Sequence, residues 1–189
     1  MNESATLLEL IQENLDEFCV SRRADFHSIS PDLVPVVDYT QSLLAGGKRF
    51  RALFCYWSWV GALSTASIRQ SESERQASAA AMVGVTAALE MFHAAALVHD
   101  DLLDQSDTRR GAPAVHKRFE SLHKASGWAG SPERFGVAGS VLVGDLMLGW
   151  SSEIFGNALL AAPNSEIETA CRNEFSKMRV EVMAGQYLD

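Results

Sequence analysis

Apolar residues recur three and four positions apart along most of the chain, the period of an α-helix with one buried face. The clearest run is Leu7, Leu8, Ile11, Leu15 and Phe18, which predicts an amphipathic helix over residues 4–23. Alternation with a period of two, typical of a half-buried strand, is not sustained anywhere. We therefore expect an all-α protein, with helices over approximately residues 4–23, 31–44, 48–63, 75–105, 114–124, 135–160 and 165 onward.

Glycines, prolines and polar residues separate the predicted helices. These breaks are Gly46-Gly47, the polar stretch 64–74 (a loop or a helix start), Gly111-Ala112-Pro113, the loop 127–132 and Pro163-Asn164. Ser165 followed by Glu168 is a capping-box pattern at the start of the last helix. Within the 135–160 helix, Gly139, Gly144 and Gly149 suggest close packing against another helix.

The composition, with 47% hydrophobic and 21% charged residues in a chain of 189, is that of an ordinary globular domain. The net charge of −8 argues against a nucleic-acid partner. Cys19, Cys55 and Cys171 lack metal-ligand spacing, so we expect reduced thiols in a cytoplasmic protein. Acidic residues interrupt the first apolar stretch, which argues against a signal peptide, and we expect no membrane span.

An apolar, alanine-rich stretch runs directly into the acidic residues Asp100, Asp101, Asp104 and Asp107. On a helix of about 3.6 residues per turn, Asp100, Asp104 and Asp107 share one narrow face, with Asp101 at its edge and His93 about two turns back on the same line. Carboxylates crowded on one face repel one another, and burial raises that cost. The pattern makes sense if a cation lies among them, and oxygen ligands at this density favour Mg²⁺.

Arg109 and Arg110 follow the aspartates and offer forked donors suited to phosphate oxygens. Carboxylates, a metal ion and arginines together describe a site for a diphosphate group. A run of charges is more often a solvated helix end. The apolar stretch before the aspartates and the arginine pair after them favour the binding site over this simpler interpretation.

A second cationic cluster lies at Gly46-Gly47-Lys48-Arg49-Phe50-Arg51, where two glycines precede three cations at a predicted helix start. Backbone N–H groups, the positive end of the helix dipole and side-chain charge can gather around an anion at such a place. Lys48 and Arg51 fall on one helix face. Basic residues near a helix start can also be merely exposed, so this cluster alone is a weak signal.

Together these motifs resemble those of the trans-polyprenyl diphosphate synthases, the head-to-tail enzymes of isoprenoid chain elongation. The segment His99-Asp100-Asp101-Leu102-Leu103-Asp104, followed by Asp107-Thr108-Arg109-Arg110-Gly111, resembles the first aspartate-rich motif of that family. Residues 46–51 resemble its GGKxxR element, with Ala52 where a proline is common. The order and spacing of the motifs make the resemblance specific.

Weaker matches add to the resemblance. His93 stands seven residues before the first aspartate, where the family has a His or Gln that contacts isopentenyl diphosphate. Gly185-Gln186-Tyr187-Leu188-Asp189 resembles the family's GQxxD element, and Gly144-Asp145 matches an element on the preceding helix.

The resemblance implies an isoprenoid-synthase-type helix bundle around a central apolar cavity. It also implies a Mg²⁺-dependent, head-to-tail condensation of isopentenyl diphosphate with an allylic diphosphate, carried out by a homodimer. Asp100 and Asp104 would be the principal metal ligands and catalytic residues, supported by Asp101, with Asp107 as a further ligand or a partner of the arginines. The residues implied to bind diphosphate are Arg109 for the allylic substrate, Lys48, Arg51, His93 and Arg110 for isopentenyl diphosphate, and Gln186 on a facing helix.

Product length depends on how deep the apolar cavity runs below the aspartates. Ala95 and Ala96 lie about one turn below Asp100, where shorter-chain members of the family tend to carry bulky aromatics, and they leave the passage open. Phe92 and Leu89, one and two turns deeper, are candidate floors. This depth suits a C20 tail, so geranylgeranyl diphosphate is the predicted product.

The family's enzymes are considerably longer, and their second aspartate-rich motif does not occur here. We therefore expect residues 1–189 to be the N-terminal part of a single all-α synthase domain, apparently truncated and inactive by itself. The alternatives are a non-catalytic partner subunit of a heteromeric synthase and a terpene cyclase. The intact aspartate motif argues against the first, and Lys48, Arg51 and His93 argue against the second, because a cyclase binds no second diphosphate.

Overall fold

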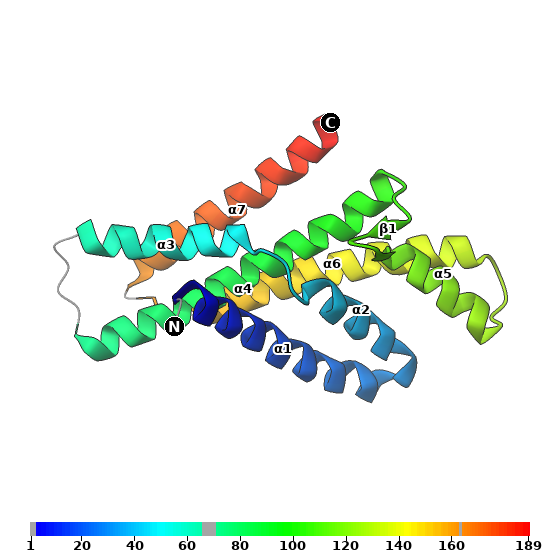
Figure 1. The fold of residues 1–189 in the computed structure, drawn as a ribbon, viewed down its shortest axis with the longest axis horizontal. Helices are drawn as coiled ribbons and strands as arrows, with labels where there is room; N and C mark the ends of the chain where they lie inside the picture. Colours follow the sequence, from blue (N-terminus) through cyan, green and yellow to red (C-terminus); the bar gives the residue numbers. More distant parts are fainter. Residues whose placement is uncertain (1–2, 66–70, 163) are drawn as a thin grey trace.

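The computed structural model describes residues 3–65, 71–162 and 164–189, which form an almost entirely helical bundle (Figure 1). The elements are α1 (Glu3–Ile29), a 3-10 turn (Pro31–Leu33), α2 (Val34–Leu44), α3 (Phe50–Thr65), α4 (Glu72–Leu103), β1 (Thr108–Arg109), β2 (Ala112–Pro113), α5 (Val115–Ser126), α6 (Pro132–Leu159) and α7 (Ser165–Leu188). The predicted all-α fold class is confirmed.

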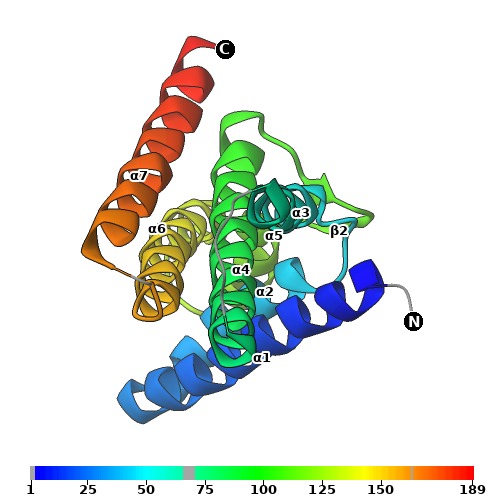
Figure 2. The same cartoon turned by 90° about the vertical axis from the view of Figure 1, so that its left-hand side faces the viewer.

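The helix α4 is the centre of the bundle and packs against α1, α2, α3 and α6. Figure 2 shows it between α6 and α7 on one side and α3 on the other. Its alanines allow this, because small side chains let neighbouring helices approach closely: Ala87, Ala88 and Ala95 are fully buried. The Ser151 hydroxyl of α6 donates to the Ala88 carbonyl at 2.8 Å, so the α4–α6 contact is also polar.

The helix α1 extends six residues beyond the predicted end at residue 23, to Ile29. Phe26 in this added part packs edge-on against Trp150 of α6, with ring centroids 5.6 Å apart, and Phe18 meets the same ring at 6.0 Å. Tertiary packing therefore continues the helix past the region where its own apolar pattern is regular.

Two helix starts differ from the sequence prediction. The helix α4 begins at Glu72 with a capping box between Ser71 and Glu74, inside the polar stretch where a helix start was one of two predictions; residues 66–70 lie outside the described part of the chain. The predicted capping box of Ser165 is wrong. Asn164 caps α7, its side-chain oxygen accepting from the Ile167 N–H at 2.9 Å, because Ser165 already lies inside the helix.

A short hairpin that was not predicted follows α4. β1 and β2 pair antiparallel, with Arg109 opposite Ala112, and Arg110 and Gly111 form the turn with φ of 52° and 80°. Positive φ at both central residues matches the twist of a two-residue hairpin turn. The hairpin reverses the chain and places Arg109 beside the end of α4.

The three glycines of α6 that were predicted to pack closely do not behave alike. A Cβ at Gly144 would lie 2.1 Å from the His99 Nε2 atom, and one at Gly139 would lie 2.8 Å from the Phe119 ring, so both positions require glycine. Nothing lies within 4 Å of the corresponding point at Gly149. Close packing is thus confirmed at two of the three positions and wrong at Gly149, which faces away from the neighbouring helices.

By length and composition alone, α4 and α6 are long and apolar enough to cross a membrane, so the expectation of no membrane span stays a prediction. Core helices of soluble proteins share these properties, and the two helices pack against one another here. Cys19, Cys55 and Cys171 are free thiols, as predicted.

Candidate functional site

The aspartate segment (residues 100–110) is organised by Arg109. Its Nε atom donates to both carboxylate oxygens of Asp101 at 2.9 Å, and its Nη2 atom donates to Asp100 Oδ2 at 3.0 Å. Asp101 is 2% exposed, so this pairing offsets the cost of burying its charge. The hydrogen bond to Asp101 raises the pKa of Arg109. The arginine predicted to bind an allylic diphosphate is therefore held by two of the predicted metal ligands.

The other two aspartates lie beyond the regular helix. The last helical residue of α4 is Leu103, and Asp104 caps the helix through its backbone, with its side chain exposed. Asp107 is further on, where its carboxylate meets Lys117 Nζ of α5 at 3.3 Å. The predicted face shared by Asp100, Asp104 and Asp107 is wrong for Asp107, because the helix ends before reaching it. Asp107 therefore links the hairpin to Lys117 of α5, whereas the sequence predicted it to be a metal ligand or a partner of the arginines.

Two more helices reach the aspartate segment. Gln186 of α7 donates to Asp100 Oδ1 at 3.3 Å, so the GQxxD-like element does face the aspartates. His99 of α4 lies over Gly144 of α6, with its Nε2 atom 3.4 Å from the Val141 carbonyl and 3.6 Å from the Asp145 carboxylate. The Gly144-Asp145 pair therefore supports the residue that precedes the first aspartate.

The glycine loop (residues 46–51) joins α2 to α3. Gly46 and Gly47 have φ of 74° and 98°, which favour glycine. Lys48 and Arg51 are exposed, and the Arg51 Nη1 atom lies 3.2 Å from His93 Nε2 on α4. The structure therefore brings together Arg51 and His93, two of the residues predicted to bind isopentenyl diphosphate.

His93 lies in a positively charged environment. Burial first, and then the charges of Arg51, Arg110 and Arg109, lower its pKa from the ordinary 6.5 to about 4. The imidazole is therefore neutral near pH 7. The same three arginines make this region attractive to an anion.

Arg110 links the glycine loop to the aspartate segment. Its guanidinium passes so close to Gly47 that a Cβ there would lie 3.3 Å from Nη1. The left-handed backbone of Arg110 in the hairpin turn directs it across to the loop, whereas Arg109 turns back onto α4. The two arginines thus lie at different ends of the site, Arg110 at the glycine loop and Arg109 at the aspartates.

Below the aspartates, α4 presents small residues and then an aromatic ring. Ala95 is fully buried, Ala96 is half-buried, and Phe92 is 5% exposed. The Phe92 ring meets the Phe175 ring of α7 edge-on at 6.4 Å, and Phe175 stacks on Phe155 of α6 at 4.1 Å. Aromatic rings from α4, α6 and α7 therefore close the space at this depth below the aspartates.

The donors for a metal ion are oxygens, which suits Mg²⁺, an ion that binds through one or two carboxylates together with substrate phosphates. Asp100 and the exposed Asp104, one turn apart, fit that role. Both oxygens of Asp101 are bound to Arg109, so its predicted supporting role requires Arg109 to move. No group of three or more His, Cys, Asp or Glu side chains arranged to hold a metal ion is found among the described residues.

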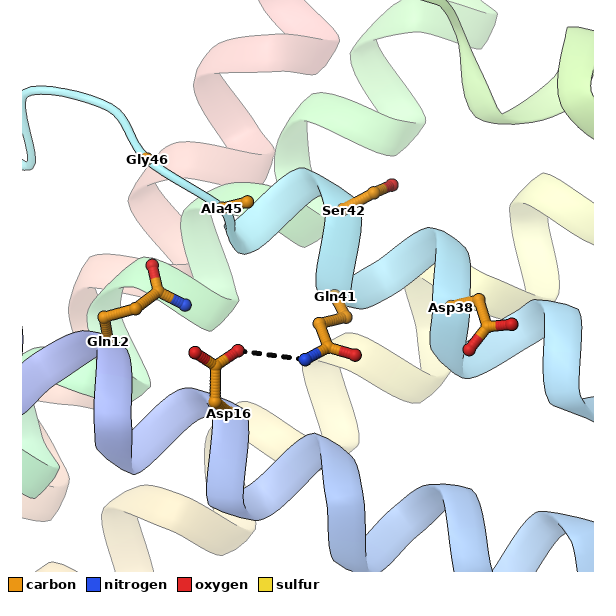
Figure 3. Close-up of a pocket in the computed structure, with 7 residues that line it drawn as sticks. All are labelled: Gln12, Asp16, Asp38, Gln41, Ser42, Ala45 and Gly46. Atoms are coloured by element: carbon orange, nitrogen blue, oxygen red, sulfur yellow. Dashed lines mark hydrogen bonds between the residues drawn. The ribbon is translucent and has the colours of Figure 1, made fainter.

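Two surface grooves are lined mostly by residues other than those of the glycine loop and the aspartate segment. One, of about 480 Å³, runs between α1 and α2, where Gln41 donates to Asp16 at 3.0 Å (Figure 3). The other, of about 530 Å³, lies between α1, α4 and α6. The first reaches Gly46, the first residue of the glycine loop.

The helical bundle has a cationic loop and, on its central helix, an arginine-bridged aspartate pair, and its fold matches those of isoprenyl diphosphate synthases. Comparison with known sequences agrees, because the sequence model of the polyprenyl synthetase family matches residues 34–189. This chain belongs to the polyprenyl synthetase family.

Individual relatives have several product lengths. The chain is 31% identical over 151 residues to a chloroplastic geranylgeranyl pyrophosphate synthase of Capsicum annuum, covering 78% of this chain and 33% of the relative. It is 29% identical over 152 residues to solanesyl diphosphate synthase 1 of Arabidopsis thaliana, covering 80% and 31%. With a geranylgeranyl diphosphate synthase of Methanosarcina mazei, the identity is 33% over 103 residues, covering 54% and 26%.

Solved structures match the whole described fold. A geranylgeranyl pyrophosphate synthase of Corynebacterium glutamicum, complexed with isoprenyl diphosphate and magnesium, has a TM-score of 0.82 at 32% identity. The match covers 97% of this chain and 49% of that one. A farnesyl diphosphate synthase of T. brucei shares the fold at 18% identity, with a TM-score of 0.74. The chain thus spans about half the length of these solved structures, and a quarter to a third of the relatives above.

Sequence reasoning missed the residues behind the glycine loop. Arg49 is 7% exposed, and Gln12 of α1 and Glu90 of α4 lie near its guanidinium. Arg49 was visible only as one of three adjacent cations. Nothing in the local pattern separates a buried arginine from its exposed neighbours, because burial is set by helices distant in the sequence.

Proposed function

We propose that this chain forms the diphosphate-binding part of a prenyltransferase that condenses isopentenyl diphosphate head-to-tail with an allylic diphosphate. In that reaction the allylic C–O bond breaks, a C–C bond forms to the isopentenyl double bond, and a proton is lost. The observation that carries the proposal is the division of cations into two sets: Lys48, Arg51 and Arg110 at the glycine loop, and Arg109 at the aspartates. Two diphosphates need two such sets.

Each set has a separate role in the proposal. Lys48, Arg51 and Arg110 hold the diphosphate of isopentenyl diphosphate, and neutral His93 contributes a hydrogen bond. Arg109 turns from Asp100 and Asp101 to the allylic diphosphate, with Gln186 keeping α7 against Asp100. Mg²⁺ held by Asp100 and Asp104 would neutralise the departing diphosphate when bound.

The proposal is tested by isothermal titration of the 189-residue chain with isopentenyl diphosphate, and with a non-hydrolysable allylic diphosphate in the presence and absence of Mg²⁺. We expect Mg²⁺-dependent binding of the allylic analogue that is lost in Asp100→Ala, and Mg²⁺-independent binding of isopentenyl diphosphate. Failure of both this chain and a chain extended beyond Asp189 to bind either compound would refute the proposal.

Product length is a finer part of the proposal. Ala95 and Ala96 leave room below Asp100, and the Phe92 and Phe175 rings close the space deeper down, which supports geranylgeranyl diphosphate. In an active extended chain, Phe92→Ala should lengthen the product by at least one C5 unit, as read by mass spectrometry. An unchanged product would remove Phe92 as the floor.

The alternative functions have no support, because the family match and the relatives above are prenyl diphosphate synthases rather than terpene cyclases or non-catalytic subunits. A homodimer and a cytoplasmic location stay predictions. Exposed apolar residues on α6, namely Val137, Val141 and Leu142, favour association with a second copy, which sedimentation equilibrium would test.

A further inference from the structure

The glycine loop has a buried cation between its two exposed ones. Arg49 is 7% exposed, whereas Lys48 and Arg51 on either side are exposed. Its backbone has φ of 46°, in the left-handed region that non-glycine residues adopt only when their surroundings enforce it. The contacts that keep Arg49 in this backbone conformation therefore also restrict the backbone of its neighbours in the loop.

Arg49 connects the loop to two helices that precede it. Its Nη2 atom donates to the Leu44 carbonyl at the end of α2, at 2.8 Å, and to the Gln12 side-chain oxygen of α1. Figure 3 shows Gln12 on α1 facing the end of α2, near Ala45 and Gly46. The residues before position 34 are outside the family match, so α1 supports the loop through a contact that the shared motif does not contain.

Of the carboxylates that act on this guanidinium, Glu90 of the central helix has the largest effect on its pKa. Burial raises the pKa of Glu90 and lowers that of Arg49, and their mutual attraction opposes both shifts. The Ala52 backbone N–H, in the first turn of α3, also lowers the pKa of Glu90. Glu90 lies one turn before His93, which meets Arg51. One carboxylate therefore acts on the loop, on α3 and on the turn of α4 that carries His93.

Two atoms of these side chains are buried without a hydrogen-bond partner among the described residues, Arg49 Nη1 and Glu90 Oε1. A buried charge is tolerated when an opposite charge compensates it, and removing one member leaves the other unpaired. Neither residue is exposed as Lys48 and Arg51 are, so neither is placed to touch a diphosphate itself.

We propose that Arg49, anchored by Leu44 and Gln12, and Glu90, one turn before His93 on α4, are positioning residues. As opposite charges facing each other across the loop and α4, they fix the spacing between Lys48 and Arg51 of the loop and His93 for the diphosphate of isopentenyl diphosphate. The inference rests on the proposed function. Arg49 and Glu90 should affect only the site for isopentenyl diphosphate, because the aspartate segment and Arg109 are held by other contacts. Loss of the pair therefore impairs one substrate site and spares the other.

The test compares the affinities for the two ligands by isothermal titration of the 189-residue chain. In Glu90→Gln and Gln12→Met, the Kd for isopentenyl diphosphate should rise about tenfold, because the cations of the loop are then misplaced for the charge-assisted hydrogen bonds to its diphosphate. The Kd for a non-hydrolysable allylic diphosphate with Mg²⁺ should stay within about twofold. Arg49→Met should show the larger loss and Arg49→Lys a partial rescue, because lysine keeps the charge without the forked geometry.

Two reference variants separate the outcomes. Lys48→Met removes a direct contact and sets the scale of the loss, and Arg23→Met removes an exposed arginine that pairs with Asp38, away from the loop, and should change neither affinity. Unchanged affinity in Glu90→Gln, Gln12→Met and Arg49→Lys, with a loss in Lys48→Met, would overturn the inference alone. So would an equal loss of both ligands, which indicates general destabilisation. A wild-type chain that binds neither ligand would overturn the proposed function and this inference together.

Discussion

The glycine loop and the aspartate segment carry opposite charges and are held in opposite ways. The exposed cations of the loop, Lys48 and Arg51, project from a backbone that a buried residue supports from behind. The carboxylates of the aspartate segment are paired with cations of the same chain, Asp100 and Asp101 with Arg109. An anion can therefore approach the loop without breaking an ion pair. At the aspartates, a metal ion that binds Asp101 must compete with Arg109, and a phosphate must compete with Asp100 and Asp101 for Arg109.

Because of this difference, substitutions in the two regions should have different effects on the stability of the fold. Charges that are exposed contribute little to folding, so the loop can be altered with small effects on stability. Charges that are buried and paired contribute through the penalty of leaving one partner alone. The aspartate segment should therefore be the fragile region and the loop the tolerant one.

The sharpest test of this contrast is Arg109→Met. The change leaves Asp101, which is 2% exposed, without its partner, so we expect a loss of about 3–5 kcal/mol in the free energy of unfolding. Urea denaturation at pH 7 followed by circular dichroism measures it. The double variant Arg109→Met/Asp101→Asn should recover part of the loss, because the uncompensated charge is gone. A loss below about 1 kcal/mol in the single variant would contradict the contrast.

The next test concerns the support behind the aspartates. A methyl group at Gly144 would meet His99 at 2.1 Å, so Gly144→Ala must displace the residue next to Asp100. We expect a loss of about 1–3 kcal/mol, typical of overpacking. Gly149→Ala on the same helix is the matched control, because nothing lies within 4 Å of it, and it should stabilise the protein by about 0.5–1 kcal/mol. Thermal unfolding compares the two, and equal melting temperatures would show that His99 moves away freely.

How far the sequence predicts this fold depends on whether a feature is local. Helical periodicity and glycine or proline breaks are local, and they placed the seven helix regions to within a few residues, apart from the end of α1. Phe26 extends α1 by packing on Trp150, which no local pattern reveals. The caps and the hairpin depend on backbone conformations at Asn164, Arg110 and Gly111 that several residue types can adopt.

The functional site likewise contains residues that local motifs identify and partners that only tertiary contacts determine. The spacing of the motifs identified the residues that meet near α4, including the contact of Arg51 with His93 and of Gln186 with Asp100. It did not reveal that Arg109 pairs with Asp101, because the hairpin that returns it was not predicted. Partners such as Glu90 and Arg49 are joined by tertiary burial, so their relation appears only in the folded chain.

On the side of the glycine loop, His93 should cause a smaller, pH-dependent change in the free energy of unfolding. The pKa of His93 is about 4 in the folded protein against an ordinary 6.5, so between these values the unfolded chain binds more protons. Stability should therefore fall as the pH drops from about 6.5 towards 4, by on the order of 2 kcal/mol, less than the full shift implies because His93 keeps contact with water. His93→Gln should flatten that part of the urea-denaturation profile, and His27→Gln, at an exposed position of α1, should not. Identical profiles for both variants would exclude His93 as the cause.

The smallest change in stability is expected from Lys48→Met. The side chain is exposed and lies over the Phe50 ring at 5.8 Å, so its loss should alter the free energy of unfolding by no more than about 0.5 kcal/mol. Its effect on binding should be larger, about a tenfold weaker affinity for isopentenyl diphosphate, equivalent to about 1.4 kcal/mol. That loss should shrink as salt is raised, since ions screen an exposed charge. Lys177→Met on α7, exposed and distant from the loop in sequence, is the control. If Lys48→Met destabilised the fold as much as Arg109→Met, the loop would also be held by its charges, and the distinction between the two regions would fail.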